Sequence, residues 1–275
     1  MNSANAFIEF ETDEIESFPE ITELNIVSGG CHLYGYMLTP DKRISSPYPA
    51  VIMSHGFPGY TTNNDLEFAL MRMGCVVIHM NHRGAWGSEG NYLFTNLKDD
   101  LVAIAKWVHN PAIADRYNID PDNIFLVGHS MGGQTVLNAA KELTFIKGAV
   151  AMAAYDIGAA FDYKMEKDLF LMIETEGQCL KMNSVSDVYE NALNNRNELS
   201  VVENYEKLLD HNILLIEAAY DTIAPPDKML KPLNKCLSEA DGKVDYVVIK
   251  SNHSFVGHRM KLANIVGEWI EKKQE

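Results

Sequence analysis

The stretch covering residues 124–133 constrains the fold of this chain more than any other segment. A short apolar run leads directly into a Gly-x-Ser-x-Gly motif centred on Ser130, and a helix-compatible run follows over 133–143. A strand, a sharp turn and a helix in this order are typical of a nucleophile elbow. Gly128 and Gly132 would provide the clearance that such a turn needs, because they carry no Cβ. The sequence therefore predicts a serine displayed at a strand end, although a glycine-rich turn that merely caps a helix would show the same pattern.

Short apolar runs alternate with helical patterns along most of the chain. The predicted strands are 23–27, 33–38, 50–54, 75–80, 124–127, 148–153, 213–218 and 244–249, and the predicted helices are 63–73, 97–108, 133–143 and a last one carrying Leu262, Ile265, Val266 and Trp269. Residues 1–20 are expected to form a polar, partly flexible leader, and 28–30 to turn a hairpin. This alternation predicts an α/β fold whose mostly parallel, eight-stranded sheet has helices on both faces.

One segment, residues 155–210, breaks this alternation. It shows helical patches without a clear strand, and we interpret it as a small cap inserted into a single domain of residues 1–275. Ligands bind outside the carboxyl ends of the strands in such sheets, so the cap is expected to lie over the site. Its apolar side chains would either line an adaptable pocket or only hold the cap together: Met165, Phe170, Met172 and Met182.

Composition excludes several classes of partner. The 23 basic and 38 acidic residues give a net charge of -15, which repels nucleic acid and anionic membranes. The four cysteines are scattered without a Cys-x-x-Cys pair, so free thiols in the cytoplasm are expected. The acidic first residues do not form a secretory signal, and no apolar run reaches the length of a membrane span. The oligomeric state stays open, with a homodimer among the alternatives.

A serine hydroxyl near neutral pH needs a base within reach, and that base needs an orienting carboxylate. Asp221 follows the predicted strand 213–218, and His253 follows the predicted strand 244–249. The order Ser130, Asp221, His253 is the order found in elbow enzymes. His258 is an alternative base five residues beyond His253.

On these motifs the chain resembles the α/β-hydrolase superfamily over residues 23–272, in particular its capped esterases and serine aminopeptidase-like members. The resemblance offers Asp156, which ends the strand after Ser130, as an alternative acid, because some members place the acid there. The stretch His55-Gly56-Phe57-Pro58-Gly59 is similar to the family's oxyanion loop. The resemblance implies that the amides of Phe57 and Met131 hold the oxyanion, each worth about 3 kcal/mol in the transition state. A plain strand-to-helix turn containing proline remains the alternative for this loop.

The remaining candidate residues are expected to play supporting roles. Arg83, in a loop similar to the family's Arg-Gly loop, is expected to brace that loop, with a substrate contact as the alternative. His55 is expected to brace the oxyanion loop, and His129 to form a buried hydrogen bond. The other histidines lack partners at metal-ligand spacing, so neither a metal nor a cofactor is expected: His79, His82 and His109.

The expected function is hydrolysis of a small carboxylic ester by a serine hydrolase through an acyl-enzyme. Amide cleavage by a small peptidase uses the same machinery and is the first alternative. An acyltransferase or a cofactor-free haloperoxidase would use the same three residues. A non-catalytic binding protein that kept the fold is a further alternative, against which the intact serine, histidine and aspartate argue.

Overall fold

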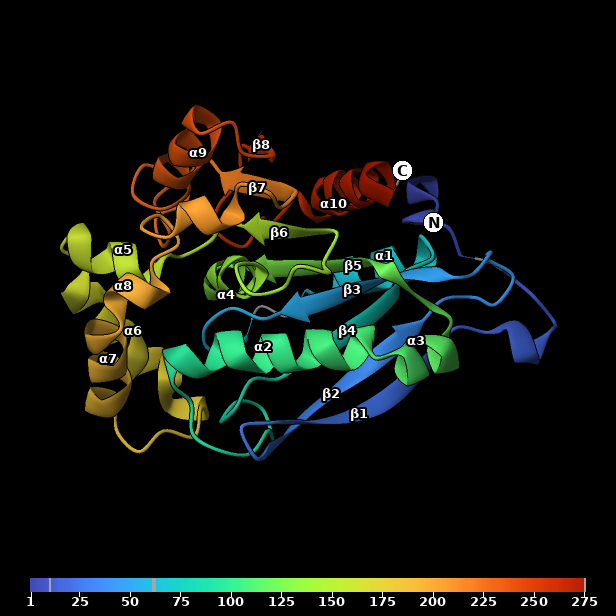
Figure 1. Cartoon of the computed structure of the whole chain (residues 1–275), viewed down its shortest axis with the longest axis horizontal. Coiled ribbons are helices and arrows are strands. Elements are labelled where there is room, and N and C mark those ends of the chain that lie inside the picture. The colour runs from blue at the N-terminus through green and yellow to red at the C-terminus, as the bar shows by residue number, and fades with distance from the viewer. Residues whose placement is uncertain (10, 61–62, 275) are drawn as a thin grey trace.

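The computed structural model describes residues 1–9, 11–60 and 63–274, which form one sheet with helices around it (Figure 1). The strands are β1 (Glu20–Ser28), β2 (Cys31–Thr39), β3 (Tyr48–Ser54), β4 (Val76–Met80), β5 (Ile119–His129), β6 (Gly148–Met152), β7 (Ile213–Ala218) and β8 (Val244–Ile249). The α-helices are α1 (Asn64–Arg72), α2 (Phe94–His109), α3 (Pro111–Tyr117), α4 (Met131–Ala140), α5 (Ile157–Asp162), α6 (Glu166–Glu176), α7 (Val185–Asn194), α8 (Arg196–Leu199), α9 (Leu230–Glu239) and α10 (Arg259–Gln274).

The eight strands lie in the order β1-β2-β4-β3-β5-β6-β7-β8. The strand β2 is antiparallel to both β1 and β4, and every other pair is parallel. The central strand β3 is buried along its whole length, as expected of a parallel strand covered on both faces. The predicted α/β fold, with a mostly parallel eight-stranded sheet, is therefore confirmed.

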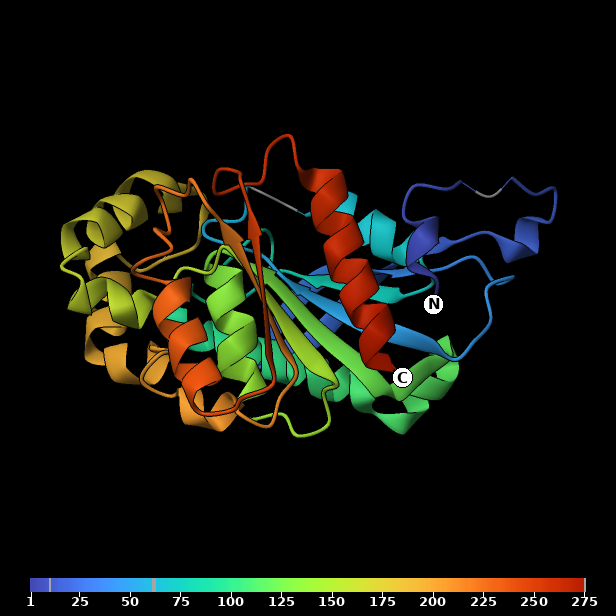
Figure 2. The same ribbon diagram turned by 90° about the horizontal axis from the view of Figure 1, so that it is seen from above.

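Helices cover both faces of this sheet. On one face, Leu101 of α2, Val136 of α4 and Leu233 of α9 belong to one apolar core with the side chains of β3 and β5. On the other face, Leu66 of α1 and Leu262 of α10 belong to a second core. Figure 2 shows α10 lying across the strands, with a group of further helices beyond one end of the sheet.

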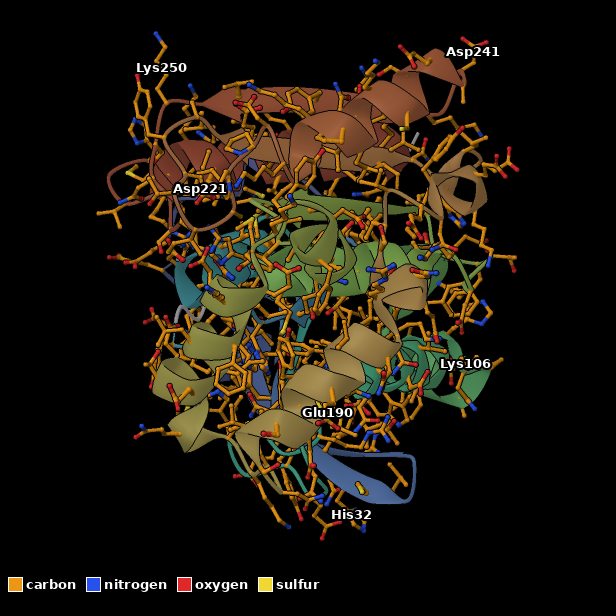
Figure 3. All side chains as sticks on the ribbon, turned by 90° about the vertical axis from the view of Figure 1, so that its left-hand side faces the viewer. His32, Lys106, Glu190, Asp221, Asp241 and Lys250 are labelled. Atoms are coloured by element: carbon orange, nitrogen blue, oxygen red, sulfur yellow. The ribbon has the colours of Figure 1, made fainter. Side chains whose placement is uncertain are left out.

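The group at the sheet end consists of α5, α6, α7 and α8, which lie between β6 and β7 in the chain. The arrowheads of β3 and β6 point toward them, so they lie beyond the carboxyl ends of the parallel strands (Figure 1). In Figure 3, which looks onto this end, Glu190 marks α7 and Asp221 lies above it, near the tip of β7. Their buried side chains form a third core that includes Leu169 and Val188. We refer to residues 157–199 as the helical insertion.

Two details of the sequence-based prediction need correction. Helices α3 and α9 were not predicted, although Pro111 after the capping Asn110 begins α3. The first residues are not a free leader: Ala6 is buried, its carbonyl accepts a hydrogen bond from Arg72 Nε at 2.7 Å, and the Asn2 amide donates to the Met73 carbonyl at 2.8 Å. In the described part of the chain, no helix combines the length and apolar character needed to cross a bilayer.

Candidate active site

Ser130 lies at the sharp turn between the last residue of β5 and the first residue of α4. Its backbone is in an unfavourable left-handed region, with φ 58° and ψ −125°. Two hydrogen bonds hold this conformation: the Ser130 amide donates to the Met152 carbonyl at 2.9 Å, and the Ser130 carbonyl accepts from the Tyr155 amide at 3.0 Å. The tip of β6 therefore fixes the turn, and the turn presents the serine at the carboxyl edge of the sheet.

The two glycines that flank Ser130 are required by close backbone contacts. A Cβ at Gly128 would lie 2.1 Å from the Gly132 carbonyl oxygen, and a Cβ at Gly132 would lie 2.1 Å from the Ser54 carbonyl oxygen. Both distances are far inside van der Waals contact, and both neighbours are backbone atoms that cannot turn away. The motif thus needs glycine at both positions, because the backbone of the turn packs directly against itself and against β3.

Asp221 and His253 come from loops after β7 and β8 and form a hydrogen-bonded pair. The Nδ1–H of His253 donates to Asp221 Oδ2 at 2.7 Å, and the aspartate side chain is almost fully buried. The other carboxylate oxygen accepts the amides of Ile223 and Ala224 at 2.9 and 2.8 Å. These backbone bonds fix the rotamer of the carboxylate, so the carboxylate in turn fixes the imidazole.

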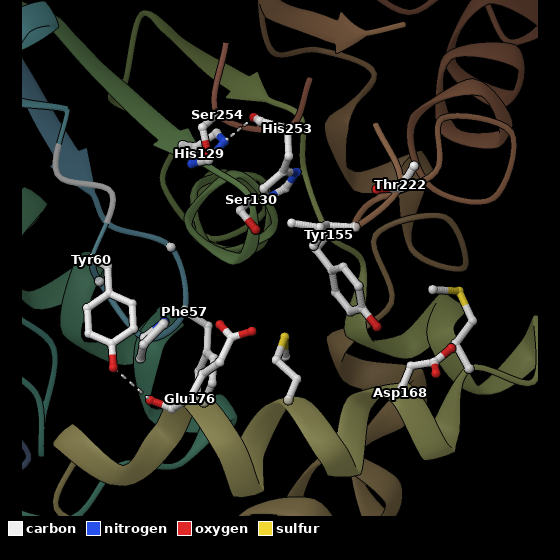
Figure 4. A pocket seen from close by; sticks show the side chains of 16 residues that line it. Phe57, Tyr60, His129, Ser130, Tyr155, Asp168, Glu176, Thr222, His253 and Ser254 are labelled. Carbon is white, nitrogen blue, oxygen red and sulfur yellow. Dashed lines mark hydrogen bonds between the residues drawn. The ribbon is translucent and has the colours of Figure 1, made fainter. Parts of the chain in front are cut away.

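The structure brings Ser130, Asp221 and His253 together. Ser130 and His253 line the same pocket, and Figure 4 shows the imidazole next to the serine hydroxyl. Among the described residues no hydrogen bond joins the two side chains.

The alternative acid and base lie elsewhere. Asp156 caps α5, and its two oxygens accept the amides of Ala159 at 3.1 Å and Val201 at 2.8 Å. Burial raises the pKa of this carboxyl, against the effect of those amide donors. His258 precedes α10 and is not among the residues that line the pocket. The geometry therefore pairs His253 with Asp221 and leaves Asp156 to hold the ends of the helical insertion together.

The amides expected to form an oxyanion hole belong to the residue after Ser130 and to the loop after β3. Met131 is the first residue of α4, so its amide has no acceptor within the helix. Among the described residues, neither the Met131 amide nor the Phe57 amide donates to a protein acceptor. The side chains of both residues are held in place: Met131 Sδ accepts from Tyr92 Oη at 2.7 Å, and the ring of Phe57 packs edge-on against that of Tyr92.

Two buried histidines support this arrangement. His129 Nε2–H donates to the His253 carbonyl at 2.8 Å, and His55 Nδ1–H donates to the Gly56 carbonyl at 2.8 Å. Burial lowers the pKa of each imidazole to about 3, and a neighbouring histidine adds to the effect in both cases. Both rings are thus neutral near pH 7 and act as hydrogen-bonding braces, as the sequence indicates.

Arg83 braces its loop through a buried carboxylate that the sequence analysis missed. Arg83 Nε donates to Asp100 Oδ1 at 2.6 Å, and the Arg83 amide donates to Oδ2 at 2.8 Å. Burial tends to raise the pKa of Asp100, but His82 and Arg83 outweigh it, so the pKa is lowered. Because Asp100 lies on α2, this pair ties the loop after β4 to a helix of the sheet layer.

The pocket above Ser130 has a volume of about 280 Å³ and takes one wall from α6. Met165 and Met172 line it, as expected, whereas Phe170 packs against Tyr189, and Met182 lies beside Gly177 and does not line the pocket. The sequence analysis missed several polar lining residues: Tyr155, Asp168, Glu176, Thr222 and Ser254. The positions 165, 168, 172 and 176 recur at helical spacing, which was a usable signal. Within the described ranges, no group of three or more His, Cys, Asp or Glu side chains is arranged to hold a metal ion.

Solved structures with the same fold include hydrolases of more than one kind. Brefeldin A esterase, described as a bacterial homologue of human hormone sensitive lipase, matches with a TM-score of 0.70 and 15% identity over 99% of this chain and 82% of its own. An esterase of Pyrobaculum calidifontis matches with a TM-score of 0.68 and 18% identity over 92% and 85%. The acylaminoacyl peptidase of Pyrococcus horikoshii matches with a TM-score of 0.71 and 17% identity over 93% of this chain, which spans only 42% of that enzyme.

The strand order, the strained serine at the elbow and these likenesses define the class: the chain has the α/β-hydrolase fold. A search of curated proteins finds no match. The model of the prolyl oligopeptidase family matches residues 62–274, and the chain belongs to that family.

Proposed function

We propose that this protein is a serine hydrolase that cleaves a small carboxylic ester through an acyl-enzyme intermediate. The observation that carries the proposal is that Ser130, in a strained turn at the sheet edge, shares a pocket with His253, which is hydrogen-bonded to Asp221. Nucleophile, base and orienting acid thus come from three separate strand ends and meet at one point. Such a meeting is the requirement for activating a serine hydroxyl.

In the proposed mechanism, Ser130 Oγ attacks the ester carbonyl carbon while His253 Nε2 takes the hydroxyl proton. The carbonyl oxygen becomes an oxyanion, which the amides of Phe57 and Met131 stabilise. Collapse of this intermediate breaks the bond to the leaving alkoxide, and the imidazolium returns its proton to that oxygen. A water molecule then attacks the acyl-enzyme by the same route. Asp221 keeps Nδ1 protonated throughout and stabilises the imidazolium.

Amide cleavage is the second candidate. Membership of the prolyl oligopeptidase family and the likeness to an acylaminoacyl peptidase favour it. Esters remain our first choice because an alkoxide leaves more readily than an amine, and because two of the similar structures are esterases. The four unpaired cysteines also support the proposal that the protein works in the reducing cytoplasm.

A fluorophosphonate probe tests the catalytic proposal. The wild-type protein should be labelled stoichiometrically, and the Ser130→Ala variant should not be labelled. Equal labelling of the two proteins, or no labelling of a folded wild type, would contradict it and favour a non-catalytic binding protein.

A substrate panel separates the two candidates. Initial rates should be measured with short-chain aryl esters and with aminoacyl anilides that share the same acyl group. Faster turnover of the anilides would contradict the ester proposal and would favour amide cleavage by a peptidase.

A further inference from the structure

The wall of the pocket contributed by α6 carries two carboxylates. Met165, at the start of α6, and then Asp168, Met172 and Glu176 follow one another at intervals of three or four residues, so they share one face of the helix. All four line the pocket. Asp168 and Glu176 are eight residues apart, which places them about 12 Å apart along the helix axis. Figure 4 shows Glu176 on the part of α6 near Phe57 and Asp168 farther along the helix, near the hydroxyl end of Tyr155.

Among the described residues, no lysine or arginine forms an ion pair with this wall. The described residues that line the pocket include no lysine or arginine, and His129 is kept neutral by burial, which lowers its pKa to about 3. The ion pairs among the described residues involve neither Asp168 nor Glu176. Lys167, the lysine next to Asp168, lines a separate surface hollow with Phe170 and Tyr189. The two carboxylates are thus left to face whatever enters the pocket.

The largely buried side chain of Tyr155 lines the same space. Tyr155 is only 4% exposed, yet among the described residues its Oη has no hydrogen-bond partner. Figure 4 shows the ring extending from the tip of β6 toward α6. Burial and the nearby charge of Asp168 raise the pKa of Tyr155 to about 12, so the phenol stays protonated. Because the side chain lines the pocket and its hydroxyl is not used by the described residues, a ligand in the pocket can bond to it.

We propose that Tyr155, Asp168 and Glu176 form a subsite for a positively charged group, and that the substrate is therefore an ester or amide that carries an amine. The carboxylates would accept charge-assisted hydrogen bonds from the ammonium group, and the phenol oxygen of Tyr155 would accept one more. Met165 and Met172, between and beside the carboxylates, would contact the alkyl part of the substrate. This inference rests on the proposed function, since it assigns the substrate class of the same pocket.

Matched substrate pairs test the subsite at pH 7. On the acyl side, p-nitrophenyl ε-aminocaproate is compared with p-nitrophenyl heptanoate, in which a methyl group replaces the ammonium. On the leaving-group side, butyrylthiocholine is compared with its tert-butyl analogue, in which carbon replaces the quaternary nitrogen. The wild type should prefer the cationic member of at least one pair by about tenfold or more in kcat/KM. A ratio near one in both pairs would overturn the inference.

Variants that remove a carboxylate test which residues cause the preference for cationic substrates. In Asp168→Asn or Glu176→Gln, and most clearly in the double variant, the ratio of cationic to neutral kcat/KM should fall toward one. Glu174→Gln, which removes an exposed carboxylate of α6 outside the pocket, is the matched control and should keep the wild-type ratio. An unchanged ratio in the double variant, or an equal fall in the control, would contradict the assignment.

Tyr155→Phe separates hydrogen bonding from charge. Removing the hydroxyl should lower the preference for the primary ammonium ester, which has N–H donors, more than the preference for the quaternary thiocholine ester, which has none. Equal effects on the two would remove Tyr155 from the subsite. Failure of the proposed function looks different, because then the fluorophosphonate would not label Ser130 and neither the neutral nor the cationic esters would be turned over.

Discussion

Two buried aspartates at strand ends, Asp156 and Asp221, differ at the scale of single residues, and the difference supports the proposed catalytic role for Asp221 alone. Each follows a parallel strand, and each accepts two or more backbone amides. Only Asp221 has an oxygen directed at an imidazole, that of His253 at 2.7 Å. We therefore expect their replacement by asparagine to affect different measurable quantities.

For Asp221→Asn we expect a large loss of activity. The amide cannot hold the His253 tautomer that leaves Nε2 free to accept a proton, and the equivalent change in serine proteases lowers kcat by about 10⁴-fold. Steady-state turnover of an aryl ester measures the effect.

Asp156→Asn is the matched control. It should lower the free energy of unfolding by about 1 to 3 kcal/mol, because buried amides lose part of their acceptor, while kcat per folded molecule stays within a few-fold of wild type. Urea unfolding and active-site titration separate the two quantities. The reverse ranking in activity would transfer the acid role to Asp156.

His129 should make stability sensitive to acid. Its pKa is lowered to about 3 by burial, from an ordinary value of 6.5, so between these values the unfolded chain binds a proton that the folded chain does not. The contribution of neutral His129 to the free energy of unfolding is therefore fully present above about pH 6.5. It is lost as the pH falls toward 3, by up to about 1.4 kcal/mol per pH unit.

The His129→Gln variant tests this, because glutamine can still donate to the His253 carbonyl but does not titrate. Urea unfolding between pH 4 and 7, a range chosen around the roughly 6.5 reference pKa, should give a flatter dependence for the variant. His55→Gln should flatten it similarly, since burial lowers the pKa of His55 to about 3 as well. Parallel curves for wild type and both variants would contradict the prediction.

At this scale the sequence was informative where a residue follows a strand directly. Ser130, Asp221 and His253 could be placed at one sheet edge because the carboxyl ends of parallel strands meet there. Asp100 could not be predicted as the partner of Arg83, because it lies in the middle of a helix with no local signal. Tyr155 was equally hidden, since its role depends on which way its ring extends at the tip of β6.

At the scale of elements, the elbow depends on three chain segments that touch without side chains between them. β3, β5 and the start of α4 approach so closely that Gly132 lies against the Ser54 carbonyl. Gly132→Ala should therefore lower the free energy of unfolding by about 3 kcal/mol or more and reduce fluorophosphonate labelling, because the added methyl must displace the turn that carries Ser130.

Gly30→Ala is a suitable control for that substitution. Gly30 has φ 75° in the β1–β2 hairpin, and a Cβ there would meet nothing within 4 Å. The Gly30→Ala variant should lower the free energy of unfolding only by the conformational cost, about 1 to 2 kcal/mol, and the fluorophosphonate should label it as it labels the wild type. Equal effects of the two substitutions on labelling would refute the packing explanation.

The strands were easier to predict than the helices. All eight predicted strands exist. The central parallel strands are continuous apolar runs because they are buried on both faces, and the turn at residues 28–30 marked the antiparallel pair β1 and β2. The short helix α3 has few apolar residues to mark a face, and α9 contains Pro232 near its start, which obscures its pattern of Leu230, Leu233 and Leu237. The internal packing of the helical insertion was beyond prediction, because it depends on contacts between helices rather than on local periodicity.

At the scale of the whole molecule, the net charge of -15 and the acidic wall of the pocket have the same sign. If the substrate carries an amine, the protein's field should raise its rate of encounter. The kcat/KM for a cationic ester should then fall as NaCl rises from about 0.01 to 0.5 M, over which the screening length shrinks several-fold. The neutral isostere should change little, and equal salt dependence of both esters would exclude such steering.

The position of Asp156 also bears on how the helical insertion can change in evolution. The residue stands at the entrance of the helical insertion, capping α5, and it also accepts the amide of Val201 just beyond its exit. The two ends of the insertion are therefore fastened to each other before they join β6 and the segment leading to β7. What lies between them begins and ends at one point, and it also bonds to the loop after β4 and to α2 through Lys181 and Asn191. We therefore expect a chimera to need Asp156 and these contacts in order to combine a relative's helices, and the relative's substrate preference, with the Ser130 turn of this chain.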